Sequence, residues 1–281
     1  MNPAGDDAPT LARGDSGGAG PTLLLLHGVT RCRDDWRPVL ADLSPRWRVI
    51  AVDHRGHGDS ARGSRYLVAD YVADAVRLIR DEIATPVVLL GHSLGAMVAA
   101  AVAAALPGLV QGVILEDPPF HGMGERIAGT SWQAQFRGMQ AAARRGGTVD
   151  ELAVSLAAIV LPRPDGTTVR LGEIREPAAI RWSAECLARL DPEVLSPVIA
   201  GRWLDGYDPL EIAARIRCPA VLLAADPRAG GALADDEAAA FAVAAGDCEL
   251  ERFPGSGHLL HWQHPRRVAA AADRLRTRVA P

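Results

Sequence analysis

The sequence predicts an α/β protein with an open, mostly parallel β-sheet that has helices on both faces. Short apolar runs alternate along the chain with segments of helical periodicity, as expected where a crossover helix follows each parallel strand. The runs do not alternate polar with apolar residues, which predicts strands buried on both faces. The length of 281 residues fits one large domain with an insertion better than two independent domains.

Six apolar runs are the expected strands. They cover residues 22–27, 47–53, 86–92, 112–117, 219–226 and 248–253. Helical patterns lie between and after them, at residues 33–43, 66–83, 94–106, 235–245 and 264–279. In open parallel sheets, ligands bind beyond the carboxyl ends of the strands, so the site is expected there.

The alternation stops between residues 119 and 205, where helical pieces occur without a clear strand. This stretch is too long for a simple connection, and we interpret it as a helical lid. The predicted organisation is therefore a flexible, glycine-rich lead-in (1–20), a core (21–118 and 206–281) and a lid (119–205).

The composition of the chain limits the classes of molecule that it is expected to bind. The net charge of −4 implies no bulk attraction to nucleic acid or to a membrane surface, so the expected partner is a small-molecule substrate. The polar N-terminus does not resemble a secretory signal, and the longest apolar run is broken by Gly, His, Ser and Pro. The four cysteines match no zinc or disulfide spacing. We expect a cytoplasmic protein without a cofactor or metal.

The pentapeptide GHSLG, residues 91–95, lies between an expected strand and an expected helix. A serine in such a G-x-S-x-G turn is exposed at the end of the sheet, and the flanking glycines let strand and helix approach closely. The alternative is a Gly-Ser turn that only caps the helix. The strand before it, the helix after it and a histidine late in the chain favour a nucleophile at Ser93.

The chain resembles the α/β-hydrolase superfamily in LLLLHGVTRCRDDW, VIAVDHRGHGDS, LLGHSLGA, GVILEDPP and FPGSGHLLHWQHP. The resemblance covers nearly all of residues 21–281 and implies the α/β-hydrolase fold. It also implies that Ser93 is the nucleophile and His258 the general base. The backbone N–H groups of Val29 and Leu94 are then the expected oxyanion hole.

The third member of the triad departs from the family pattern. Relatives usually carry an acid a few residues after the next-to-last strand, where this chain has Arg228. Asp226, two residues earlier, is the first choice for the acid, and Asp117 or Glu116 after the fourth strand are the alternatives. His261 and His264 are interpreted as packing or surface residues.

The loop DHRGHGDS, residues 53–60, is another feature of the family. We interpret it as a structural brace, because its glycines allow tight turns and its Arg and Asp can bind backbone groups. A metal site made by Asp53, His54 and His57 is the alternative.

The predicted function is a serine hydrolase that cleaves a small or medium apolar ester or lactone through an acyl-enzyme. An apolar pocket is one reading of the aromatic and methionine side chains of the lid, and a core of the lid itself is the other. These side chains are Phe120, Met123, Trp132, Phe136, Met139 and Trp182. The alternatives are a C–C bond hydrolase acting on a β-diketone or ring-fission product with the same triad, and a non-catalytic ligand-binding module.

Overall fold

The computed structural model describes residues 9–122, 124–163 and 165–279. Its centre is a seven-stranded sheet in the order β1-β3-β2-β4-β5-β8-β9, in which β1 is antiparallel to β3 and the other neighbours are parallel. The strands are β1 (Arg13–Asp15), β2 (Thr22–Leu26), β3 (Arg48–Val52), β4 (Val87–His92), β5 (Val110–Glu116), β8 (Ala220–Ala225) and β9 (Cys248–Phe253). The predicted open, mostly parallel sheet is confirmed.

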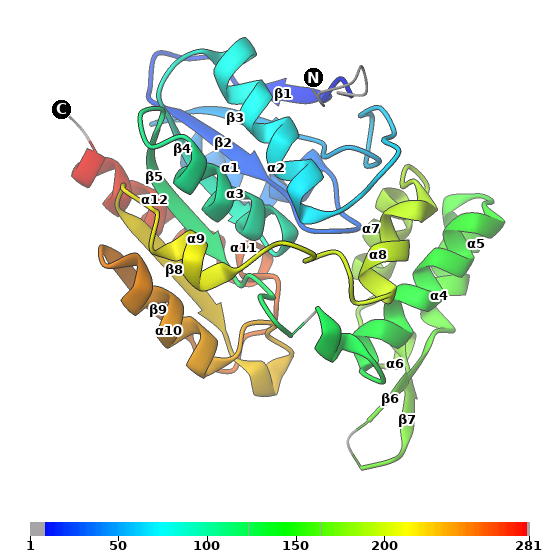
Figure 1. Ribbon diagram of the computed structural model, residues 1–281. Helices are drawn as coiled ribbons and strands as arrows, with labels where there is room; N and C mark the ends of the chain where they lie inside the picture. Colours follow the sequence, from blue (N-terminus) through cyan, green and yellow to red (C-terminus); the bar gives the residue numbers. More distant parts are fainter. Residues whose placement is uncertain (1–8, 123, 164, 280–281) are drawn as a thin grey trace, which may run out of the picture.

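Helices cover both faces of this sheet (Figure 1). Leu24 and Leu26 of β2 belong to one apolar core, and Leu23 and Leu25 to the other, because side chains alternate across a strand. On the first face lie α2 (Val68–Arg77) with its π-helical extension (Leu78–Ile83), α3 (Leu94–Ala105), α9 (Pro209–Ala213) and α10 (Asp235–Ala245). On the second lie α1 (Arg37–Leu43), α11 (Leu260–Gln263) and α12 (Pro265–Val279).

The strand register brings the loops of the site together. Leu26 pairs with Gly91, and Gly91 pairs with Leu115, so β2, β4 and β5 end at nearly the same level. The turns that follow them, at His27, Ser93 and Asp117, therefore lie side by side at the carboxyl edge of the sheet.

Residues 119–205, here named the cap, lie beyond that edge (Figure 1). The cap contains α4 (Ser131–Arg145), α5 (Val149–Ala157), β6 (Val160–Pro162), β7 (Thr168–Arg170), α6 (Leu171–Ile174), α7 (Pro177–Leu187) and α8 (Leu195–Ile199). Short 3-10 turns at Glu125–Ile127 and Pro192–Val194 connect these helices. The antiparallel hairpin β6-β7 differs from the expected all-helical segment, and the Asp165-Gly166 turn is its local signal.

The N-terminal segment differs from the expected flexible lead-in where it is described. Residues 13–15 form β1 on β3, and the Ala12 carbonyl accepts a hydrogen bond from Asp53 N–H at 2.8 Å. The first eight residues of that lead-in lie outside the described residues. Across the described chain, no helix has the length and apolar character needed to cross a membrane.

Candidate active site

Ser93 lies in a strained turn between β4 and α3. Its backbone has φ 54° and ψ −115°, a conformation that is uncommon for residues other than glycine. A Cβ on Gly95 would lie 1.9 Å from the Leu26 carbonyl oxygen, and one on Gly91 would lie 2.1 Å from the Gly95 oxygen. The two glycines therefore let α3 pack directly against β2 and β4, as the motif predicted.

The loop after β2 packs against this turn. A Cβ on Gly28 would lie 3.2 Å from the Ser93 Cβ, so the backbone of this loop lies beside the serine. The next N–H, on Val29, has no hydrogen-bond acceptor within the described chain, and neither has the N–H of Leu94 at the start of α3. Two unpaired donors next to one serine can stabilise a negatively charged oxygen.

His258 contacts Asp117. The His258 Nδ1–H donates to Asp117 Oδ2 at 2.6 Å, which leaves Nε2 available for the serine. Ser93 and His258 line the same cavity, and the structure records no hydrogen bond between them. Trp132 of the cap packs its ring edge to face with His258, with centroids 5.4 Å apart.

Asp117 is held in place by backbone groups. It is fully buried, and its φ of 46° turns the chain sharply after β5. Its carboxylate accepts hydrogen bonds from the N–H groups of Ala232 (2.8 Å), Ala225 (3.2 Å) and Leu233 (3.4 Å). These donors fix the orientation of the carboxylate beside the imidazole.

The expectation that Asp226 faces His258 is wrong. Asp226 instead caps the turn after β8, where its carboxylate accepts from the Arg228 N–H at 2.9 Å and from the Gly255 N–H at 3.0 Å. The Gly255 N–H and the Arg228 guanidinium lower the pKa of Asp226 to about 2. The turn after β8 directs this side chain away from the imidazole, and Asp117 occupies the position beside it.

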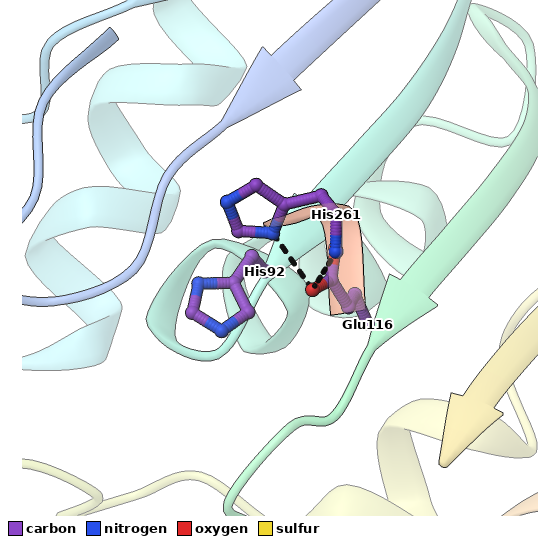
Figure 2. A group of neighbouring side chains, drawn as sticks. All are labelled: His92, Glu116 and His261. Carbon is purple, nitrogen blue, oxygen red and sulfur yellow. Dashed lines mark hydrogen bonds and ion pairs between the residues drawn. The ribbon is translucent and has the colours of Figure 1, made fainter. Parts of the chain in front are cut away.

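Glu116, the remaining candidate acid, contacts a different histidine (Figure 2). Its Oε1 accepts from His261 Nδ1–H at 2.7 Å and from His261 N–H at 3.0 Å. The other ring nitrogen of His261 donates to Asp35 Oδ2 at 3.2 Å. Burial alone would lower the pKa of His261, but Glu116 and Asp35 outweigh it and raise the pKa to about 9. His261 is therefore a buried imidazolium between two carboxylates.

His92 lies beside this ion network and connects it to His258. Its Nε2–H donates to the His258 carbonyl at 3.0 Å, and its ring centroid is 4.6 Å from that of His258. The side chains of His92, Glu116 and His261 come close enough together to bind a metal ion in principle. Both nitrogens of His261 donate to carboxylates, however, and an imidazolium has no free lone pair for a metal. The arrangement fits a brace for His258 better than a metal centre.

The loop after β3 is a second brace. Asp53 accepts from the backbone N–H of Arg33 at 2.6 Å and of Asp59 at 3.0 Å. His57 Nε2 accepts from the Thr30 N–H at 3.3 Å and so supports the loop that carries Val29. These contacts fit the structural interpretation of residues 53–60 rather than the metal alternative.

Three cavities surround Ser93 and His258. The Ser93 cavity, about 40 Å³, is lined by Val29, Thr30, Arg31, His92, Ser93, Trp132, Gln135, Phe136, Arg175, His258 and Leu259. The His258 cavity, about 400 Å³, adds Ser131, Leu161, Leu171, Ile174, Ala229, Gly230, Gly257 and Gln263. The Arg31 cavity, about 40 Å³, adds Met139, Leu156, Ala179, Ile180 and Ser183.

The apolar side chains of the cap divide between the two readings. Trp132, Phe136 and Met139 line these cavities. Phe120 instead stacks on Phe241 of α10, and Trp182 Nε1–H donates to Asp35. Met123 lies outside the described residues.

Several polar residues of the site escaped the sequence analysis. Arg31 and Asp35 fall within the stretch LLLLHGVTRCRDDW, which by itself gives neither of them a role, and Gln135 and Arg175 come from the cap, where no motif surrounds them. Arg175 stands between Ile174 and Glu176 in a chain whose basic residues are all arginine, so no local signal marks it. Only the docking of the cap on the core brings Gln135 and Arg175 to Ser93.

Comparison with known proteins points to one family. The model of the alpha/beta hydrolase family matches residues 23–271. A 101-residue stretch is 41% identical to 2-(acetamidomethylene)succinate hydrolase of Mesorhizobium japonicum, and the match covers 36% of each chain. The chain thus spans about a third of the length of the curated relatives it matches.

Solved structures share the fold over nearly the whole chain. The N-formylmaleamic acid deformylase of Pseudomonas putida S16 has a TM-score of 0.74 at 24% identity, covering 94% of this chain and 96% of that one. The enol-lactonase of Burkholderia xenovorans LB400 has a TM-score of 0.72 at 18% identity, covering 96% and 97%. At these identities the likeness shows the fold.

Proposed function

Because the chain belongs to the alpha/beta hydrolase family, we propose that it is a serine hydrolase that cleaves a small ester or lactone by way of an acyl-enzyme. Ser93 is the nucleophile, His258 the general base and then acid, and Asp117 the carboxylate that orients His258. The N–H groups of Val29 and Leu94 bind the oxyanion.

The reaction proceeds in two halves. Ser93 Oγ attacks the carbonyl carbon while His258 Nε2 takes its proton, and the carbonyl oxygen becomes the oxyanion. His258 then protonates the leaving alkoxide, and the acyl group stays on Ser93. Water, deprotonated by His258, attacks the acyl carbon; the bond from that carbon to Ser93 Oγ then breaks, His258 returns the proton to Ser93 Oγ, and the acid leaves. Asp117 stays ionised and stabilises the imidazolium in both halves.

The contact that supports this proposal most strongly is the 2.6 Å hydrogen bond from His258 Nδ1–H to the buried Asp117 carboxylate. It selects the imidazole tautomer whose Nε2 has a free lone pair. A histidine that only stabilised its loop would have no reason to lie next to a strained serine and two unpaired N–H groups.

A fluorophosphonate probe tests the proposal without a known substrate. We expect a covalent adduct on Ser93, located by mass spectrometry of the peptides. Ser93→Ala removes the adduct and His258→Ala slows its formation strongly, because the serine then has no base. Ser64→Ala, which changes an exposed loop serine, serves as the matched control and keeps full labelling.

An unlabelled Ser93 in a folded protein contradicts the hydrolase proposal and favours a ligand-binding module on this fold. A labelled protein that turns over no ester or lactone favours the second candidate, hydrolysis of a C–C or amide-type bond by the same residues. The Mesorhizobium japonicum relative, named as a hydrolase of 2-(acetamidomethylene)succinate, is the observation behind that candidate.

A further inference from the structure

Arg175 occupies an unusual position for a charged residue. It follows α6, is only partly exposed, and lines all three cavities around Ser93 and His258. No side chain or carbonyl in the described part of the chain hydrogen-bonds or ion-pairs with its guanidinium. Burial and the nearby cation of Arg31 lower the pKa of Arg175, so the folded protein disfavours this charge. An unpaired, partly buried guanidinium costs stability, which points to an anionic partner that binds there.

Arg31 supplies a second cation in the same space. Arg31 and Arg175 both line the Ser93 cavity and the Arg31 cavity. Arg31 Nη1 donates to Ser183 Oγ of α7 at 3.2 Å, and its Nε lies 4.0 Å from Asp35 Oδ2. The core loop and the cap thus each contribute one arginine to the lining of these two cavities.

The ion network behind the site is complete without Arg175. Asp35 and Glu116 are its two buried carboxylates, and His261 and Arg31 are its two cations. Arg175 takes no part in this network, and the charged group that acts on it in the described chain is another cation, Arg31. One carboxylate on a ligand would neutralise Arg175, and guanidinium groups bind carboxylates through paired N–H donors.

Gln135 of α4 adds an adaptable polar group. It lines the same three cavities as Arg175, and within the described residues its amide makes one contact, to the Met139 sulfur at 3.9 Å. Its amide N–H groups can therefore donate to a carboxylate oxygen near Arg175.

We propose that the substrate carries a free carboxylate, which binds between Arg175 and Arg31 while its scissile carbonyl lies at Ser93. The inference rests on the proposed hydrolase function. Arg31 and Arg175 line both the Ser93 cavity and the Arg31 cavity, whereas Ser93 lines only the first, so the carboxylate lies a few carbon atoms away from the reacting carbonyl.

The kinetic test compares two esters with acyl chains of five carbons. 4-Nitrophenyl hydrogen glutarate ends in a carboxylate, and 4-nitrophenyl pentanoate ends in a methyl group. We expect the wild-type protein to have the higher kcat/KM for the glutarate ester, after subtraction of the rate with Ser93→Ala. Arg175→Met should lower the glutarate-to-pentanoate ratio by about 10- to 100-fold, the range for a lost hydrogen bond to a charged group.

Two further variants test whether the effect is specific to Arg175 and whether it depends on the charge or on the paired donors of the guanidinium. Arg137→Met removes an exposed arginine from the same cap and should leave both rates unchanged. Arg175→Lys keeps the charge but not the paired donors and should recover part of the ratio. Arg175→Met should unfold at the same temperature as the wild type or higher, since no partner among the described residues loses a contact; a large loss of stability would indicate a structural role and overturn the proposal.

A binding measurement separates failure of this inference from failure of the hydrolase function. Titration calorimetry of glutarate into Ser93→Ala, with and without Arg175→Met, needs no turnover. Glutarate that binds only when Arg175 is present supports the carboxylate site even if no ester is cleaved. Turnover of both esters with an unchanged ratio in Arg175→Met, and no glutarate binding, overturns the carboxylate site and leaves the hydrolase function standing.

Discussion

Asp117 and Asp226 both follow central strands of the sheet, yet the structure gives them opposite environments. Asp117 is fully buried and contacts His258, whereas Asp226 binds Arg228 and the turn at Gly255. The difference lies in the backbone, since φ of 46° at Asp117 turns its side chain toward the imidazole. At the scale of one residue, the direction of a side chain decides which carboxylate can act on a base.

Asp117→Asn should therefore lower kcat by about 10³- to 10⁴-fold, because an amide favours the wrong tautomer of His258. Asp226→Asn is the matched control and should change kcat only a few-fold. The measurement is the initial rate of 4-nitrophenyl ester hydrolysis for the two variants. A large loss in Asp226→Asn with a small loss in Asp117→Asn would reverse the assignment.

His261 makes a second prediction at this scale. Its pKa in the folded protein, about 9, is above the ordinary value of 6.5. Its ion pairs therefore stabilise the fold fully below pH 6.5, and this contribution is lost as the pH rises through 9. The destabilisation caused by His261→Gln should shrink by on the order of 3 kcal/mol between pH 6.5 and 9.5. Urea unfolding at the two pH values measures it, and a constant difference would contradict the buried imidazolium.

At the scale of elements, the site depends on how closely α3 packs against β2. A Cβ at Gly95 meets the Leu26 carbonyl oxygen, which belongs to a sheet strand and cannot move aside. The same contact positions the Ser93 turn beside the loop after β2. The short distance between these two elements therefore sets the geometry of the proposed oxyanion hole.

Gly95→Ala should destabilise the protein by about 3 kcal/mol, since overpacking against backbone forces the helix away from the sheet. Gly108→Ala is the control, because a Cβ there meets nothing within 4 Å. Denaturant midpoints report the difference between the variants. Equal midpoints would show that α3 tolerates a shift at this contact.

At the scale of the whole molecule, buried histidines connect the strand ends. His27 Nε2 accepts from the His54 N–H at 3.0 Å, and His57 Nε2 accepts from the Thr30 N–H. An imidazolium cannot accept, so these rings are neutral in the fold. Burial accordingly lowers the pKa of His27 to about 3 and of His57 to about 4, and lowers the pKa of His54 and His92 well below 6.5.

These four groups predict a stability profile in acid. Because their pKa values are lower in the folded state, their contribution is present above pH 6.5 and is lost as the pH falls, when unfolding takes up protons. Each of these histidines lowers the free energy of unfolding by up to about 1.4 kcal/mol for each pH unit of acidification. Together they should lower it by about 4 kcal/mol between pH 6.5 and 5.5. Urea titrations across this range test it, and a flat profile would contradict neutral histidines.

The sequence by itself determined the parallel sheet, the order of its strands and helices, and the turn at Ser93. These features are local, because the burial of a strand and the tight turn at a serine depend on residues that lie within a few positions of one another in the sequence. The role of His258, which follows the last strand, was implied by the family resemblance.

Only the tertiary structure decided which carboxylate faces His258 and which polar groups surround Ser93. Asp117 depends on three N–H donors more than 100 residues away, and Arg175 reaches the site only when the cap docks on the core. Such contacts join segments that share no local pattern, and the free energy that selects them comes from burial and charge pairing across the whole fold.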